Sequence, residues 1–215
     1  VLLSSLLSRK NEEGLGQSEV AAAVSVLKCA KGLDLISRVE EELKCPEGEC
    51  VWLDKEVPRS AIVSSLDSTR VETLELLCAS WKKTSLPGKG ELDLLRRAIP
   101  VELTCASMGF RSRFVTLLSK FFERILIATR SARSRRRADD RWRAEHGKGR
   151  EAKEAAEDEE AELRECISFL IWLRGHLSRC LYPGAPVTRR QLALDLLVAM
   201  ARVFRVDGGS GGEEE

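Results

Sequence analysis

One short pattern occurs three times in this chain: an arginine followed by leucines four, six and seven residues later, at the head of a long apolar-striped segment. The copies begin at Arg70, Arg111 and Arg190, and the middle copy has Val115 in place of its first leucine. Arg70 and Arg111 are 41 positions apart (111 − 70), close to the roughly 40 to 47 residues of a HEAT or armadillo repeat. Arg111 and Arg190 are 79 apart (190 − 111), almost two such periods. The repeat predicts an all-α protein, an α-solenoid of HEAT/armadillo-like helical hairpins.

The composition agrees with a helical fold. Of the 215 residues, 43% are hydrophobic, 32% are charged and only 5% are aromatic, while prolines number six. This balance is typical of a globular chain and favours helices over strands. The net charge of +1 gives no overall reason to expect an acidic partner, and no run approaches the roughly 20 apolar residues that would span a bilayer. We therefore expect no membrane association, and any charged partner must bind a local cluster.

Apolar residues recur at helical spacing along most of the chain. We expect N-caps at Asp67 or Ser68 and at Thr188, and a loop at Lys44–Val57, which contains proline and glycine. The stretch 107–128 is the most apolar and should lie at the centre of the array. The expected helices are 18–31, 33–43, 59–66, 67–81, 91–104, 107–128, 163–181 and one that starts at 188.

A charged segment separates the second and third copies of the pattern. Residues 130–150 contain nine basic and three acidic residues, whereas residues 151–165 contain eight acidic and two basic residues. Trp142 is nearly its only large apolar residue, so the segment cannot bury a face and is predicted to be a mobile loop or a solvated helical extension. We divide the chain into helical repeats at 1–129, this charged insertion at 130–162, a final helical hairpin of the same array at 163–206 and a flexible tail at 207–215.

The arginines of this insertion have two interpretations. They could contact RNA phosphates, because a guanidinium offers both charge and a planar set of donors. They could instead belong to a self-neutralising linker, which we favour because acidic residues follow immediately. Arg133–Arg137 also fits a nuclear localisation signal. The candidate RNA contacts are Arg133, Arg135, Arg136, Arg137, Arg141 and Arg143.

No set of residues predicts catalysis, a metal site or a cofactor site. Among seven cysteines, Cys45 and Cys50 form the only close pair, and zinc would need two more ligands. The two histidines, His146 and His176, lie far from that pair in sequence. The segment Pro87–Gly90 lacks the spacing and the preceding strand of a phosphate-binding loop. We predict that the chain is not an enzyme and that its cysteines are reduced.

Three segments in a fixed order carry a family resemblance: 67–78, 107–125 and 181–194. Together they resemble the thyroid adenoma-associated protein family of large helical-repeat proteins, over roughly Ala61 to Val206. The resemblance implies a non-catalytic subunit that works with an FtsJ-type methyltransferase to place a 2′-O-methyl group in the tRNA anticodon loop. It also implies that the partner binds S-adenosylmethionine and that this chain is a fragment whose remaining repeats belong to a longer protein. No family motif assigns an enzyme or tRNA contact to a particular residue.

We therefore predict a scaffold or regulatory subunit for tRNA methylation, whose partners are the methyltransferase subunit and tRNA. A HEAT-type adaptor that binds only proteins is the first alternative, and an enzyme of unrecognised type is the second. The expected location is the cytoplasm, with the nucleus as the alternative.

Overall fold

The computed structural model describes residues 17–33, 42–44, 50–52, 64–79, 84–146 and 150–205. The tail at 207–215 lies outside these residues, as do parts of the first predicted hairpin. The elements are α2 (Gln17–Gly32), β1 (Glu42–Lys44), β2 (Cys50–Trp52), α4 (Asp67–Cys78), α5 (Lys89–Glu102), α6 (Met108–His146), α7 (Arg150–Arg179) and α8 (Val187–Val203).

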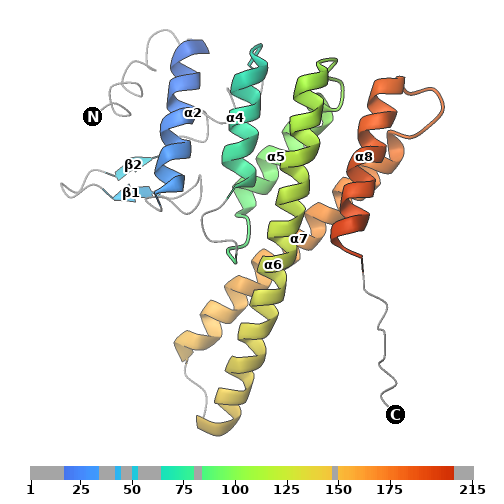
Figure 1. Ribbon diagram of the computed structural model, residues 1–215. Helices are drawn as coiled ribbons and strands as arrows, with labels where there is room; N and C mark the ends of the chain where they lie inside the picture. The colour runs from blue at the N-terminus through green and yellow to red at the C-terminus, as the bar shows by residue number, and fades with distance from the viewer. Residues whose placement is uncertain are drawn as a thin grey trace, which may run out of the picture.

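The helices form two layers (Figure 1). In the front layer α2, α4, α6 and α8 lie side by side and run in the same direction, with α4 packed between α2 and α6, and α6 packed against α8. Behind them, α5 and α7 contact each other and return the chain from one front helix to the next. The three helices that carry the repeated arginine are thus consecutive members of one layer, and the predicted α-solenoid is confirmed.

The two spacings of the repeat have different structural causes. One returning helix, α5, separates α4 from α6, and one returning helix, α7, separates α6 from α8. The 38 extra residues of the second spacing (79 − 41) lengthen the α6–α7 hairpin, because α6 runs for 39 residues and α7 for 30. The interval that resembled almost two periods therefore holds a single unit. Alanine, arginine and glutamate are strong helix formers, which is why both helices continue through the charged segment.

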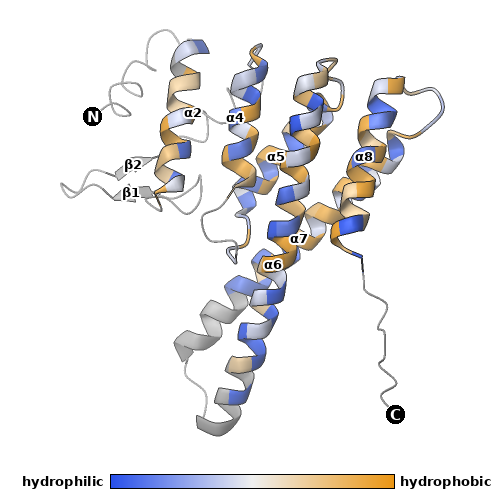
Figure 2. Ribbon diagram, viewed as in Figure 1, coloured by the Kyte–Doolittle hydropathy of each residue, from blue (hydrophilic) through white to orange (hydrophobic). Residues whose placement is uncertain are grey.

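The core lies between the two layers and is centred on α6. Phe114, Phe121 and Phe122 are completely buried. Phe121 meets Phe169 of α7 edge to face, with ring centroids 5.9 Å apart, and Phe122 lies 6.3 Å from Phe204, just beyond α8. Apolar residues follow these inward faces, whereas the lower part of α6 is mostly hydrophilic (Figure 2). The predicted central position of 107–128 is confirmed.

Several predicted boundaries were wrong. Leu66 and Pro186 precede α4 and α8 and make no side-chain cap hydrogen bond, so Asp67 or Ser68 and Thr188 are not the caps. The helix expected from 163 starts at Arg150, and the helix expected to end near 128 continues to His146.

Two short strands also appear where a helix end and a loop were expected. β1 and β2 pair antiparallel, with Leu43 opposite Val51. Val51 and Trp52 have high strand propensity, and pairing with β1 satisfies backbone groups that a loop would leave to solvent.

Candidate nucleic-acid interface

The charged segment forms a protrusion, which we call the extension: residues 130–146 of α6 and 150–162 of α7. It leaves the packed layers at their lower end in Figure 1. At its base Ala128 and Ala132, one helical turn apart, are buried. Their small side chains allow a close approach of the two helices. The extension is therefore a helical continuation of the array, which is the second of the two forms that the sequence predicts.

Ion pairs connect the two helices beyond the alanines. Arg135 pairs with Glu159, and Arg136 lies 3.3 Å from Glu160. Arg164 lies 3.1 Å from the same Glu160 carboxylate, one turn along α7. The opposite charges of the two sequence blocks thus face each other where the helices run together. This arrangement stabilises the hairpin only modestly, because these side chains are partly solvated.

The six arginines proposed as RNA contacts do not form one group. Arg135 and Arg136 are held in ion pairs with α7. Arg133, Arg137 and Arg141 are exposed and make no ion pair with a described residue. Arg143 belongs to α6, but its side chain lies outside the described part of the chain. Their role as RNA contacts stays a prediction.

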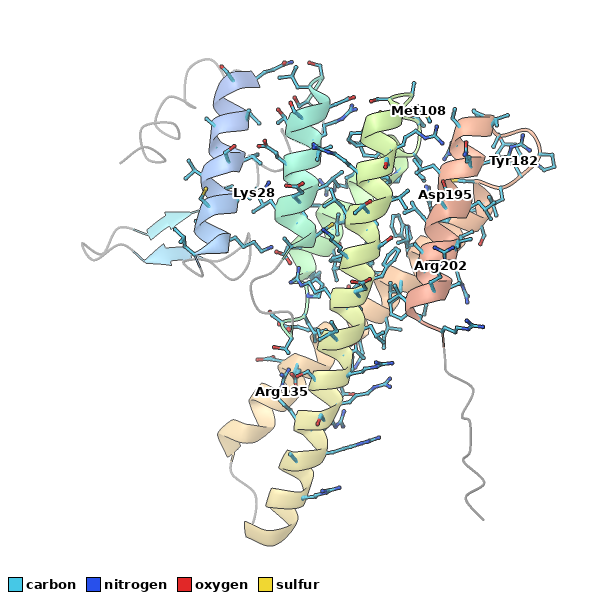
Figure 3. The ribbon with its side chains drawn as sticks, in the orientation of Figure 1. Lys28, Met108, Arg135, Tyr182, Asp195 and Arg202 are labelled. Atoms are coloured by element: carbon cyan, nitrogen blue, oxygen red, sulfur yellow. The ribbon has the colours of Figure 1, made fainter. Side chains whose placement is uncertain are left out.

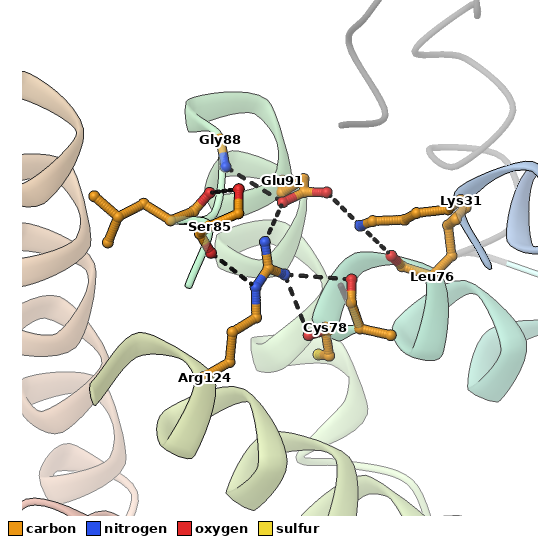
Figure 4. A network of polar contacts seen from close by, with 9 residues as sticks. Lys31, Leu76, Cys78, Ser85, Gly88, Glu91 and Arg124 are labelled. Carbon is orange, nitrogen blue, oxygen red and sulfur yellow. Dashed lines mark hydrogen bonds and ion pairs between the residues drawn. The ribbon is translucent and has the colours of Figure 1, made fainter. Parts of the chain in front are cut away.

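A buried charge cluster holds the upper part of α6 in place (Figure 4). Glu91 of α5 is completely buried and accepts from Lys31 of α2, at 2.6 Å, on one carboxylate oxygen. Its other oxygen lies 3.6 Å from the guanidinium of Arg124 in α6. Burial lowers the pKa of Lys31, while the charge of Glu91 and its hydrogen bond act in the opposite direction. The cluster therefore joins three helices through one desolvated carboxylate.

The same cluster satisfies the ends of two helices. Arg124 donates to the carbonyls of Cys78 and Ala79 at the end of α4, and to that of Ser85 in the following turn, each at 3.3 Å. Glu91 accepts from the backbone N–H of Gly88 at the start of α5. A cation at a helix C-terminus and a carboxylate at an N-terminus both oppose the helix dipoles favourably. Burial also raises the pKa of the Cys78 thiol to about 12, so this thiol is not a nucleophile at neutral pH.

Sequence reasoning missed this cluster. Arg124 stands among buried apolar residues of α6, between Phe122 and Ile125, and that position was an available signal. A charge inside an apolar stripe requires a buried partner. Its partners come from distant helices, however, and helical spacing alone cannot identify them.

The repeated arginines connect neighbouring front helices. Arg70 pairs with Asp67 at 2.5 Å and with the buried Glu102 of α5 at 3.5 Å, and its guanidinium lies over the ring of Phe110 in α6 at 4.9 Å. Arg111 of α6 donates to the carbonyl of Thr188 in α8 at 3.2 Å. Arg70 and Arg111 thus each contact the first turn of the next front helix, which is a packing role.

The remaining residues that could have taken part in catalysis or metal binding were also located, where the structure describes them. His176 stacks on Trp172, with ring centroids 5.5 Å apart, and burial together with Arg179 and Arg189 lowers its pKa. Across the described ranges no group of three potential metal ligands occurs, and none of the described helices is both long and apolar enough to cross a membrane. Cys45 and the side chains of Cys50 and His146 fall outside the described residues.

Stacked helical hairpins with a charged protrusion define a helical-repeat protein as the class. More particularly, the chain belongs to the family described as Trm732, TPR repeats, whose model matches residues 2–208. The sequence predicted HEAT/armadillo-like repeats, and the family description names TPR repeats. Both are classes of stacked helical hairpins.

Curated relatives agree with this family. The protein named tRNA (32-2′-O)-methyltransferase regulator THADA from Canis lupus familiaris is 28% identical over 146 residues, and the one from Homo sapiens is 27% identical over 146 residues. The matches cover 65% of this chain but only 7% of each relative's length. No solved structure matches the chain. The predicted resemblance to the thyroid adenoma-associated protein family is confirmed, and these relatives are named as regulators of a methyltransferase, in line with the prediction that the chain is not an enzyme.

Proposed function

We propose that this chain is part of a non-catalytic scaffold that supports 2′-O-methylation of tRNA. The observation that carries the proposal is the family match over residues 2–208, together with relatives named as regulators of a tRNA 2′-O-methyltransferase. The finer proposal is that the partner is an FtsJ-type methyltransferase, that it binds the methyl donor and that it modifies the anticodon loop. We place this activity in the cytoplasm, with the nucleus as the alternative.

The fold suits such a role physically. Stacked hairpins hold distant surfaces at fixed separations, because each unit packs rigidly on its neighbours. Here the buried cluster of Lys31, Glu91 and Arg124 fixes α6 to the units before it, and the ring contact of Phe122 with Phe204 fixes it to α8. The extension is a continuation of that same α6. A molecule bound to the extension would therefore be held in a defined position relative to one bound on the layers.

The test is deletion of the full-length protein, with 2′-O-methylation of the anticodon loop measured on isolated tRNA. We expect this 2′-O-methylation of the anticodon loop to be lost after the deletion and to return when the protein is restored. We also expect the FtsJ-type enzyme to co-purify with the protein. Unchanged methylation after deletion would contradict the proposal, and methyl transfer by this purified chain alone would show that it is an enzyme.

The self-neutralised side of the extension favours a second candidate, a protein adaptor without an RNA role. Arg135 and Arg136 already have carboxylate partners in α7, as a solvated linker would require. The adaptor predicts that deletion removes a protein complex and leaves tRNA methylation intact. The same deletion experiment therefore separates the two candidates.

A further inference from the structure

The part of α6 within the extension has two different sides. Arg130, Arg133, Arg137 and Arg141 follow one another at intervals of three, four and four residues. At about 100° per residue they fall within a sector of about 80°, and at about 1.5 Å per residue they extend over about 16 Å. All four are exposed. We call this set the arginine stripe.

The opposite side of the same helix faces α7. By the same arithmetic the buried Ala132 and the paired Arg135 point about 140° to 160° away from the middle of the stripe. The paired Arg136 points about 100° away from it. Among the described side chains, the arginines that pair with α7 are therefore different ones from the four of the stripe.

No acidic residue occurs between positions 126 and 138, so Arg130 and Arg133 have no acidic residue within four positions on their own helix. Asp139 and Asp140 precede Arg141, and their side chains lie outside the described part of the chain.

The end of α8 brings further arginines to the same region. Phe204, just beyond α8, packs against Phe122 of α6, and its chain neighbours Arg202 and Arg205 are exposed. Arg133 lies eleven residues after Phe122, close to three full turns, and therefore on the same side of α6. Figure 3 shows Arg202 at the lower end of α8, and nitrogen-tipped side chains project from the lower part of α6 toward the same side. The lower end of α8 and the stripe thus lie on the same side of α6, where the extension leaves the packed layers.

We propose that the arginine stripe, with Arg202 and Arg205, is a surface that binds the phosphate backbone of RNA. The proposal rests on the proposed tRNA role and assigns the contact to particular residues. Arginines at successive turns of a straight helix can each meet a phosphate with charge and paired donors. Because Arg202 and Arg205 lie at the end of α8, beside the start of the stripe, an RNA strand lying along the stripe would also meet charge from this second helix.

An acidic protein is the competing ligand, and the side chains between the arginines favour RNA over it. From 128 to 138 the residues other than arginine are alanine, serine and threonine. A stable protein interface normally has a desolvated core of large apolar or aromatic side chains, which this segment lacks. Phosphate binding needs no such core, because release of counterions supplies much of its free energy.

The experiment measures binding of an unmodified tRNA transcript to the full chain over a range of salt concentrations. The stripe variant is Arg130→Gln with Arg133→Gln and Arg137→Gln. The matched control is Arg135→Gln with Arg136→Gln and Arg164→Gln, which removes the same charge from the ion-paired side. Circular dichroism verifies that helix content is equal. A third protein, with lysine at the three stripe positions, keeps the charge.

We expect the stripe variant to lose at least about ten-fold in affinity near physiological salt, with a slope of log K against log salt that is shallower by about 2 to 3. The control should bind within about two-fold of the wild type, and the lysine protein within about three-fold, because charge is the main contribution. Arg202→Gln with Arg205→Gln should weaken binding by about five-fold, as expected for two further phosphate contacts.

Three results would overturn the proposal: unchanged tRNA binding by the stripe variant, equal losses in the stripe variant and the control, or wild-type binding by the Arg202 and Arg205 variant. A stripe variant that still binds tRNA but no longer binds polyglutamate would identify a protein-docking surface instead. This assay contains no methyltransferase. Failure here, with methylation still dependent on the protein in cells, would therefore reject the arginine surface and leave the proposed function standing.

Discussion

The packed layers and the extension use the same kind of interaction, an arginine paired with a glutamate, in opposite environments. Glu91 and Arg124 are almost completely buried and join α5 to α6. Arg135 and Arg136 keep 49% and 61% of their side-chain surface exposed while they pair across the extension. Removal of one partner from a buried pair leaves the other charge desolvated and unpaired. In an exposed pair, water solvates the charge that remains. The layers therefore depend on each partner, and the extension can change its charges at little cost in stability.

The largest expected effect is in the apolar core of the layers. Phe121→Ala should lower the free energy of unfolding by about 4 kcal/mol, because the ring is fully buried against Phe169 and its loss leaves a cavity. Urea unfolding followed by circular dichroism measures it. Leu117 is only partly buried, so Leu117→Ala should cost less and serves as the matched comparison. Equal stability of wild type and the Phe121 variant would contradict the central position of α6.

The buried charge cluster should be nearly as sensitive. Glu91→Gln keeps the size of the side chain but leaves Lys31 and Arg124 without their shared carboxylate, and we expect a loss of about 3 kcal/mol. The same urea measurement applies. Glu165→Gln is a control on a partly exposed pair with Arg96 and should change stability by less than about 1 kcal/mol. Equal effects of the two substitutions would remove the distinction between buried and exposed pairs.

Glu102 introduces a pH dependence within the layers. Burial raises the pKa of this carboxyl to about 7 from its usual 4.5, with Arg70 acting to lower it and Asp67 to raise it. A folded-state pKa above the unfolded value gives stability that is complete below about pH 4.5 and is lost as pH rises through about 7. Glu102→Gln should therefore become more stable relative to wild type as pH increases from 5 to 8. Thermal unfolding at several pH values measures the difference, and a constant difference would contradict the raised pKa.

Exposed pairs of the extension should contribute less. Arg135→Gln and Arg136→Gln should each lower the free energy of unfolding by no more than about 1 kcal/mol, because solvent already screens these pairs. Each difference should also shrink in high salt. A loss comparable to that of Glu91→Gln would show that the two helices of the extension and the layers unfold as one cooperative unit.

Removal of the extension should have the smallest effect on stability. Replacement of residues 133–160 by a short glycine-serine linker deletes the exposed ion pairs but keeps Ala128 and Ala132. We expect the free energy of unfolding to change by less than about 1 kcal/mol, since loop closure depends only weakly on length. Loss of cooperative unfolding in the shortened chain would mean that the layers need the extension in order to fold.

The arginine pattern at Arg70, Arg111 and Arg190 was enough to predict that the three helices that carry it stack in one array, because helices of a repeat stack on their neighbours. The helix ends could not be predicted as well. Leu66 and Pro186 precede their helices without capping side chains, which local preference does not anticipate. The candidate site was predicted only in part: six arginines were proposed on the basis of charge, but the sequence reasoning did not say which side of the helix each one occupies.

By itself, the sequence determined that the chain is helical and repetitive, that its most apolar segment is central and that opposite charges meet in one insertion. These features depend on local propensity and periodicity, which are properties of residues close together in the sequence. Only the tertiary structure decided which charges are buried and which are free. Lys31, Glu91 and Arg124 come together from three helices. Arg135 and Arg136 form ion pairs with α7, while the arginine stripe faces the solvent. The physical reason is that desolvation and pairing depend on which distant helix lies opposite a side chain, and residue spacing along one helix does not contain that information.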